Sequence, residues 1–399
     1  MHKLAYAFSA VGLVACGSPA EFEFARAEQD LVSDCVPSVT SHYLRIQEQQ
    51  AGRYFDVSTT SGEGSRVYGG GYAPVDNQEF AVMPVAGDAN LFFIAALHRG
   101  GLLWSTVGAK HPLYMDEGTI PHTDSALSQF QIVSNEAAGC NPPDIPSPFH
   151  ITQKYWGNVL DVSNTRRERN MVYVGNNVGG ANQLFEFVEG REFPNPMPVE
   201  VVGATPGAIG DVPRMTDFSS TPSLESTSVT IGVRALPFVY VLGDGGLPYQ
   251  VQNTPYYSLT REQLWKRGPI QEKPRGVALT QTYSVETGVA ASTSLQVERT
   301  LSFATKINGG LEFSNSDLKA TLGVSLEQQL QVHTTLTDTF SHDTTTTESR
   351  SLSFGADQHI RWTSWQQFDR FTLRRMDGTM VMQWDVAFGT DAVIDAIAE

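Results

Sequence analysis

Alternating apolar and polar positions run through much of the chain, and they are clearest in its second half. From Leu295 to Phe313 the odd positions are mostly apolar and the even positions mostly polar, which is the period of a two-faced β-strand. From Leu318 to Val332 the apolar residues occupy even positions, after a turn-like stretch at Ser314–Asp317. We therefore predict a long hairpin over residues 295–332.

The same alternation, in shorter runs bounded by Gly, Pro and Asn, recurs elsewhere, whereas long amphipathic helical patterns are scarce. The chain is therefore predicted to be all-β. Near the C-terminus, residues 359–388 predict closing strands joined by a tight turn at Asp377-Gly378. We expect Trp362, Trp365 and Trp384 to pack in a core, with contact to lipid or a partner as the alternative. The acidic residues at the very end are expected to be frayed.

A repeated unit organises the first half of the chain. Asp56 lies 22 residues before Gln78, Asp161 lies 22 residues before Gln183, and each Asp follows the Ile that opens its unit by ten residues. A more degenerate unit lies between these two and ends at Phe130. One such unit cannot bury its apolar face alone, but three packed together can.

Three units of about fifty residues, each with a Gln and a Phe near its end, resemble the β-trefoil of ricin-type lectins, with Phe in place of the usual Trp. The resemblance covers roughly residues 40–190. It implies sugar sites in which an Asp accepts hydrogen bonds from hydroxyl groups, an aromatic ring stacks on the sugar, and an Asn completes the polar set. The candidate carbohydrate-binding residues in this register are Asp56, Tyr68 and Asn77 in unit one, and Asp161, Tyr173 and Asn182 in unit three.

The middle unit has Ser105, Thr119 and Ser128 at these positions, so the site chemistry is absent there. An alternative interpretation is that Asp56 and Asp161 only cap turns, a common role for Asp, in a purely structural trefoil.

Prolines between residues 194 and 206 mark a linker to a second domain. Soon after it, TPYYSLTREQLW (residues 254–265) resembles the stretch that follows the trefoil in insecticidal binary toxins, although packing of its aromatic residues into a core is an alternative explanation.

Each arm of the 295–332 hairpin exceeds the roughly 9 to 11 residues that a transmembrane β-strand needs. Ser/Thr-rich stretches flank it, TQTYSVETGVAASTS before and HTTLTDTFSHDTTTTESRSLSF after. A trefoil followed by this pattern resembles the aerolysin-like β-pore-forming family, which includes epsilon-toxin relatives and fungal haemolytic lectins, over about residues 200–390.

That resemblance implies a hairpin that inserts into a membrane after subunits assemble into a ring. The membrane-inserting residues it implies are Leu301, Phe303, Ile307, Leu311, Phe313, Leu318, Leu322, Val324 and Leu326. Arg299 on the apolar face argues against burying the whole first arm in lipid. A strand pair covering a soluble sandwich would show the same alternation.

The first residues, MHKLAYAFSAVGLVACGS, have the pattern of an export signal and are too short to cross a bilayer. Leu13–Cys16 resembles the bacterial lipobox, which implies a lipid on Cys16, although an ordinary secretory signal is the alternative. We expect Cys35 and Cys140 to form a disulfide, with free thiols as the alternative. The expected location is outside a bacterium, lipid-anchored at the outer membrane or cell surface, or released.

Charge and motifs exclude other classes of protein. With 43 acidic against 27 basic residues and no basic cluster, a nucleic-acid partner has no electrostatic support. Because no HExxH, Gly-x-Ser-x-Gly, Walker or zinc-ligand pattern occurs, we expect no catalysis, cofactor or metal. Scattered carboxylates leave a glycosidase pair open.

We expect a signal peptide at 1–15, a linker at 16–39, a trefoil at 40–192, a linker with first strands at 193–230, and a pore-forming module at 231–399. The predicted function is a carbohydrate-binding pore former whose partners are a glycan or glycolipid receptor, a membrane and further copies of the chain in a ring. The alternative is a lipid-anchored surface lectin or adhesin whose β-domain does not insert.

Overall fold

The computed structural model describes residues 41–58, 65–85, 88–106, 110–116, 126–134, 148–165, 168, 170–198, 201–205, 207–241, 244–287, 296, 304–307, 310–313 and 346–399. Several predictions concern residues outside these ranges: the signal peptide, the lipid on Cys16, the disulfide between Cys35 and Cys140, and most of the predicted hairpin. Leu301, Phe303, Leu318, Leu322, Val324 and Leu326 lie outside the described residues. In the described part of the chain, no helix has the length and apolar character needed to span a membrane.

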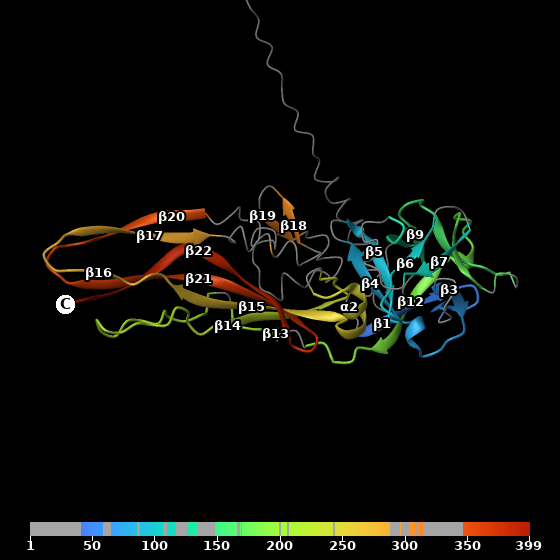
Figure 1. Ribbon diagram of the computed structural model, residues 1–399, viewed down its shortest axis with the longest axis horizontal. Helices are drawn as coiled ribbons and strands as arrows, with labels where there is room; N and C mark the ends of the chain where they lie inside the picture. Colours follow the sequence, from blue (N-terminus) through green and yellow to red (C-terminus); the bar gives the residue numbers. More distant parts are fainter. Residues whose placement is uncertain are drawn as a thin grey trace, which may run out of the picture.

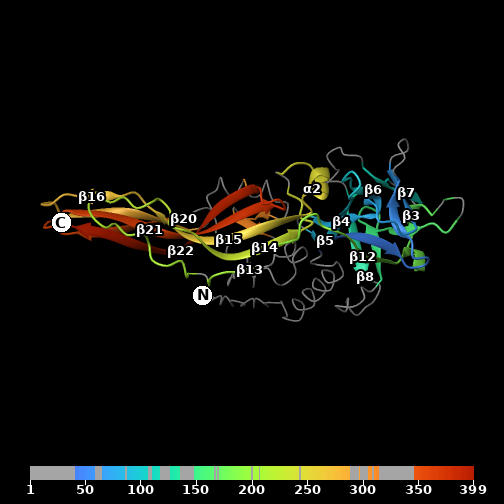
Figure 2. The same ribbon diagram turned by 90° about the horizontal axis from the view of Figure 1, so that it is seen from below.

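The predicted all-β class is confirmed, and the strands fall into two regions along an elongated molecule (Figures 1 and 2). The first region is an antiparallel sheet of twelve strands. They are β1 His42–Glu48, β2 Tyr54–Val57, β3 Ser65–Gly70, β4 Phe80–Val85, β5 Asp88–Ala96, β6 Leu103–Ser105, β7 His111–Met115, β8 Phe130–Ser134, β9 Phe149–Gln153, β10 Val159–Val162, β11 Val172–Gly175 and β12 Phe185–Glu192.

The sequence repeat appears in this sheet as a shared core. Phe80, Phe130 and Phe185, which close the three units, are all fully buried. Two 3-10 helices, η1 Asp76–Gln78 and η2 Ala181–Gln183, occupy equivalent places in units one and three. Because Phe130 aligns with the other two phenylalanines, Ser128 takes the place of Gln78 rather than that of Asn77, one position from the predicted alignment.

The second region is a sheet of long strands with the order β13-β14-β15-β21-β16 and with β22 on the other side of β21. Its bounds are β13 Val201–Val202, β14 Val229–Pro237, β15 Tyr256–Arg267, β16 Gln271–Lys273, β21 Ile360–Arg375 and β22 Met380–Ala398. The predicted turn at Asp377-Gly378 is confirmed, with Gly378 at a positive φ of 84°. Trp362, Trp365 and Trp384 are buried as expected.

The expectation of a frayed C-terminus is wrong. β22 pairs with β21 as far as Ala398, and Glu399 exchanges two backbone hydrogen bonds with His359. The reason is the length of β21, which begins at Ile360 and so offers a partner to the whole tail.

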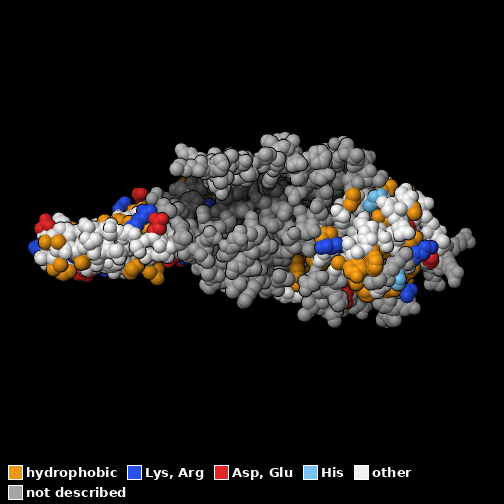
Figure 3. All heavy atoms as spheres, turned by 90° about the horizontal axis from the view of Figure 1, so that it is seen from above, with side chains coloured by type: hydrophobic (Ala, Val, Ile, Leu, Met, Phe, Trp, Pro, Cys, Tyr) orange, Lys and Arg blue, Asp and Glu red, His pale blue; other side chains and the backbone are white. Residues whose placement is uncertain are grey.

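A two-stranded ribbon lies on the long sheet beside β22 (Figure 1). It pairs β17 Leu279–Thr287 with β20 Thr346–Phe354, so these strands bracket residues 288–345. Its outward face is polar at every described position, with directly opposed pairs such as Thr282 with Ser351 and Ser284 with Ser349. Figure 3 shows this surface as largely neither charged nor hydrophobic.

Within the bracketed segment, the predicted continuous arm from Leu295 to Phe313 is wrong. β18 Ala304–Ile307 pairs with β19 Gly310–Phe313, and Ile307 is opposite Gly310. The chain therefore reverses between Ile307 and Gly310, within the span predicted to be one straight arm. The intervening sequence is Asn308-Gly309, the dipeptide most typical of a two-residue hairpin turn.

Residues 207–228, here called the strap, run along the long sheet on the face opposite the ribbon (yellow-green in Figure 1). The backbone N–H of Gly207 donates to Gln263, and that of Met215 donates to Asp395. Trp265 donates to the carbonyl oxygen of Gly210. The predicted linker is thus a covering layer of the sheet, and its buried apolar residues are Ile209, Val212 and Met215.

A short helix, α2 Leu247–Asn253, joins the two regions. Leu247 and Val251 belong to the core of the first sheet, and the Tyr43 hydroxyl donates to the carbonyl oxygen of Val251 at 2.7 Å. Gly100 has a positive φ of 65°, and a Cβ there would lie 2.2 Å from the Cα of Pro248. The approach of α2 to the first sheet therefore requires glycine at position 100.

Gly100→Ala should loosen this junction. The new methyl group meets backbone, which cannot rotate away, and the left-handed conformation adds roughly 1–2 kcal/mol. With overpacking added, we expect a loss of about 2 kcal/mol or more in free energy of unfolding, measured by urea denaturation. Gly71→Ala, where a Cβ has open space, is the control and should change stability little. Equal losses in both variants would contradict the role given to Gly100.

Candidate functional site

The three residues predicted for the unit-one site lie together. Asp56 of β2 is paired directly with Tyr68 of β3, and the Asn77 side-chain amide donates to Asp56 Oδ1 at 2.6 Å. Gln78 donates to Asp56 Oδ2 at 2.8 Å. Both carboxylate oxygens are therefore oriented by amide donors, while each keeps a further lone pair that can accept a hydrogen bond.

Unit three repeats this arrangement. Asn182 donates to Asp161 Oδ1 at 2.7 Å, and Gln183 donates to Asp161 Oδ2 at 2.8 Å. Tyr173 is paired directly with Asp161 across β10 and β11. The two units are thus congruent in their hydrogen bonding and not only in their spacing.

The two carboxylates differ in accessibility. Asp56 is half-buried, whereas Asp161 is only 5% exposed. Burial, together with the charge of Asp161 and a hydrogen bond to it, raises the pKa of Tyr173 well above its usual range. The Tyr173 hydroxyl therefore covers the unit-three carboxylate, and an incoming hydroxyl group would have to share or replace that contact.

Glycine keeps the space beside Asp56 open. A Cβ at Gly70 would lie 2.9 Å from Asp56 Oδ2 and would press on the carboxylate. At the equivalent place in unit three, a Cβ at Gly175 would lie 3.1 Å from the Tyr173 ring. In such a site the oriented carboxylate can accept hydrogen bonds from the hydroxyl groups of a sugar, and the Tyr ring can stack on the apolar face of that sugar. The glycine leaves room for the sugar beside the carboxylate.

Sequence reasoning missed two parts of this arrangement. Gln78 and Gln183 marked the ends of the units, but their role in holding the carboxylates was not predicted. The signal was their fixed spacing of 22 residues from each Asp. The glycines Gly70 and Gly175, two residues after each Tyr, repeat in the same register.

The unit-two positions carry no such cluster among the described residues. Ser105 is buried, and its hydroxyl donates to the backbone of Thr106 and His111. Thr119 lies outside the described residues. Nowhere in the described ranges do three or more His, Cys, Asp or Glu gather as a metal site would require.

The contact between the ribbon and the long sheet is small and partly polar. Val285 is the one fully buried side chain among those described in the ribbon. The Trp362 indole N–H donates to Gln281 at 2.5 Å, and Gln366 exchanges hydrogen bonds with the backbone of Glu286. The Tyr283 and Phe354 rings also pack against Trp362, with 6.0 and 5.8 Å between ring centroids. The ribbon is thus held by partly buried aromatic and polar contacts around a single fully buried Val, whose burial stabilises by roughly 1.5–3 kcal/mol.

An open cavity of about 350 Å³ lies beside this contact. Residues of both layers line it, among them Lys266 and Phe368 of the sheet and Tyr283 and Glu286 of the ribbon. The ribbon and the sheet are therefore not packed against each other over the whole of their overlap.

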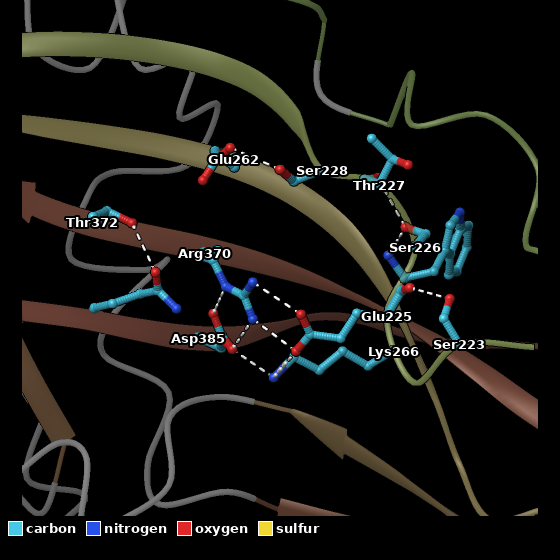
Figure 4. Close-up of polar contacts among 12 residues, drawn as sticks. Ser223, Glu225, Ser226, Thr227, Ser228, Glu262, Lys266, Arg370, Thr372 and Asp385 are labelled. Atoms are coloured by element: carbon cyan, nitrogen blue, oxygen red, sulfur yellow. Dashed lines mark hydrogen bonds and ion pairs between the residues drawn. The ribbon is translucent and has the colours of Figure 1, made fainter.

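A charged cluster fastens the C-terminal end of the strap to the sheet (Figure 4). Arg370 donates to both oxygens of Glu225, at 2.8 and 3.0 Å, and its Nε donates to Asp385 at 2.8 Å. Lys266 lies 2.5 Å from Asp385 and 3.6 Å from Glu225. The hydrogen bonds from Arg370 hold the pKa of Glu225 below its usual range. Burial alone would raise the pKa of Asp385, but hydrogen bonds from Arg370 and Lys266 outweigh it and lower that pKa.

These lowered pKa values predict an acid-labile attachment. A carboxylate with a lowered pKa in the folded state stabilises the fold above its unfolded pKa of about 4, and this contribution is lost as the pH falls through the folded pKa. Glu225→Gln should therefore lower the free energy of unfolding by up to about 1 kcal/mol at pH 7. Below about pH 3 the free energies of unfolding of the variant and the unmodified protein should differ less. Urea unfolding at both pH values measures this. Glu189→Gln, an exposed glutamate of β12 outside the cluster, is the control, and a pH-independent deficit in Glu225→Gln would contradict the assignment.

Similarity to a solved structure defines the fold class of the whole chain. The crystal structure of Cry35Ab1 superposes with a TM-score of 0.58 at 16% sequence identity, covering 90% of this chain and 90% of that one. The protein is therefore an all-β protein that shares the fold of Cry35Ab1.

A family match adds information on the second region. Residues 229–397, less than half of the chain, match the model of the family Insecticidal Crystal Toxin, P42. No curated protein matches the sequence.

Smaller structures resemble part of the chain more weakly. The agglutinin of Rhizoctonia solani gives a TM-score of 0.30 at 16% identity, over 39% of this chain and 99% of its own. The designed three-fold symmetric protein ThreeFoil gives 0.31 at 18% identity, over 37% of this chain and 98% of its own.

Proposed function

We propose that the protein is a glycan-directed toxin component whose first sheet is a ricin-type β-trefoil and whose long sheet carries an aerolysin-like pore-forming device. In this proposal residues 40–192 bind a glycan or glycolipid receptor, and residues 231–399 assemble with further copies of the chain on a membrane. Residues 193–230 connect these two parts. No catalytic step is part of it.

The observation that carries the glycan-binding half is the duplicated cluster around Asp56 and Asp161. Two separate places in one chain hold an Asp, a Tyr, an Asn and a Gln with the same hydrogen bonds. An Asp that only caps a turn needs no aromatic partner, and it needs no glycine beside it to leave space for a ligand. The turn-cap interpretation therefore leaves the recurring Tyr and Gly unexplained.

The ribbon supports the membrane-active half. Its two strands bracket the segment 288–345. Its outward face is a polar ladder of Ser and Thr with one Glu, and its inward face has one fully buried side chain among those described. Such a layer can separate from the sheet at low cost, and lateral pairing with ribbons of other copies would satisfy its exposed edges. A closed barrel is the arrangement in which strands can cross hydrocarbon with no edge left unpaired.

The match of residues 229–397 to an insecticidal toxin family agrees with this assignment. We further propose that the protein is exported from a bacterium and anchored by a lipid on Cys16, or released, with Cys35 and Cys140 paired. Mass spectrometry of the mature protein tests these modifications directly.

Dye release from vesicles tests the proposed function. The mature protein should release an entrapped dye from vesicles that contain glycolipid and release much less from matched vesicles without it. Glycan binding without release at any pH, or after limited proteolysis, would instead identify the alternative, a surface lectin or adhesin with a non-inserting β-domain. Absence of any glycan binding would contradict the whole proposal.

A further inference from the structure

The glycan-site face of the β2–β3 hairpin extends beyond Asp56. Tyr54 and Asp56 are two residues apart on β2, so they share one face, and the residues paired with them on β3 are Gly70 and Tyr68. The burial pattern agrees, since Tyr54, Asp56, Tyr68 and Gly70 are half-buried and the residues between them are buried.

Tyr72 continues this face beyond the end of β3 and is 61% exposed. Its ring packs edge-on against Tyr54, with 5.7 Å between the ring centroids. The guanidinium carbon of Arg45 lies 4.9 Å from the centre of the Tyr72 ring, and Arg45 is itself buried in an ion pair with Glu79. An exposed aromatic ring is thus held in a fixed orientation by two neighbours.

The loop that carries Tyr72 is fastened to the carboxylate site. The Gln78 side chain accepts from the N–H of Ala73 and donates to the carbonyl oxygen of Gly71, each at 2.8 Å. The same amide donates to Asp56. Tyr72 and Asp56 are therefore positioned by one shared side chain.

Unit three shows that the loop does not require these aromatic residues. Its positions equivalent to Tyr54 and Tyr72 are Val159, which is buried, and Asn177, which is exposed. Its loop nevertheless makes the same hydrogen bonds, from Val178 to Gln183 at 2.9 Å and from Gln183 to Asn176 at 2.8 Å. The Tyr54–Tyr72 pair is thus an addition to unit one and not part of the common fold.

We propose that Tyr72, supported by Tyr54 and Arg45, is a second subsite that stacks the next sugar residue of an oligosaccharide whose first residue binds Asp56 and Tyr68. Tyr54, against which the Tyr72 ring packs, lies one two-residue step along β2 from Asp56, about 6.6–6.8 Å, a spacing comparable with one pyranose unit. Unit one therefore selects oligosaccharides over monosaccharides, whereas unit three lacks the second ring. This inference rests on the proposed function.

The experiment uses the full mature chain carrying Asp161→Asn and Tyr173→Ala, which remove both the carboxylate and the stacking ring of unit three. A printed array of mono- and oligosaccharides identifies the recognised terminal sugar. Calorimetry then gives the affinity for that sugar free and within the recognised oligosaccharide. We expect the oligosaccharide to bind about 3- to 10-fold more tightly than the monosaccharide.

Tyr72→Asn, which introduces the residue of unit three, should remove this preference and leave monosaccharide affinity unchanged. Tyr72→Trp should retain the preference. If Tyr72→Asn keeps the full preference, or weakens both ligands equally, the second subsite is wrong and the proposed function stands. If the unmodified chain binds no glycan on the array, the proposed function and the subsite both fail.

Discussion

Cross-linking Glu286→Cys to Gln366→Cys should abolish dye release, and cleaving the cross-link should restore it. Gln366 exchanges hydrogen bonds with the backbone of Glu286, whose own side chain is exposed on the outward side of β17, so the reducible thiol cross-linker must be long enough to pass around that strand. A covalent link there ties the ribbon to β21 in the long sheet. A residual release of at most a few per cent is expected, because an opening step that is blocked covalently cannot be driven by membrane binding.

The matched control links the ribbon only to itself. Thr282 and Ser351 are directly opposite each other on β17 and β20, and Thr282→Cys with Ser351→Cys closes that pair without tying either strand to the sheet. This variant should release dye normally when oxidised. Each single-cysteine variant controls for reaction with the native cysteines. Full release by the Glu286–Gln366 cross-linked protein would show that the ribbon does not need to leave the sheet.

Removing the two carboxylates together should lower vesicle binding by about 100-fold or more. A hydrogen bond to a charged group contributes roughly 1.5–3 kcal/mol, which is about ten-fold or more in affinity for each site, and the two sites act together on a surface that presents many glycans. Of the two single variants, Asp56→Ala should weaken vesicle binding more than Asp161→Ala, because Asp161 is covered by Tyr173 and only 5% exposed.

Co-sedimentation with glycolipid vesicles measures this effect. The substitutions also remove acceptors from Asn77 and Gln78 or their counterparts, so each variant should lose stability, roughly 1–3 kcal/mol for each site. Thermal unfolding separates that loss from the loss of binding. Asp116→Ala, at the end of β7 in the same sheet, is a control that should bind normally. Equal binding by Asp56→Ala and the unmodified protein would leave the unit-one cluster as a structural turn cap.

The internal repeat predicted that units one and three share one arrangement, and the resemblance to ricin-type lectins pointed to the Asp, Tyr and Asn in each. Spacing from Asp to Gln is identical in units one and three, and in the structure that Gln holds the Asp, so the hydrogen bond explains why the spacing is fixed. The long closing strands were also predicted, because β21 and β22 combine alternation with an Asp-Gly turn.

Other features carry no periodic signal. Part of the strap is held through backbone groups, for example those of Gly207, Gly210 and Met215, and such contacts impose no pattern on the side chains. In the predicted hairpin, period two identified strand-forming residues but did not show where the chain reverses. The Asn308-Gly309 dipeptide within that alternation was the local signal for the reversal.

The tightly paired C-terminus has a practical consequence. Glu399 is hydrogen-bonded to His359 at the end of the molecule farthest from the first sheet, as Figures 1 and 2 both show. A fluorophore attached there would be rigidly placed at the opposite pole from the glycan sites. Energy transfer from that label to acceptors in the bilayer would report whether the bound molecule stands upright or lies flat on the surface.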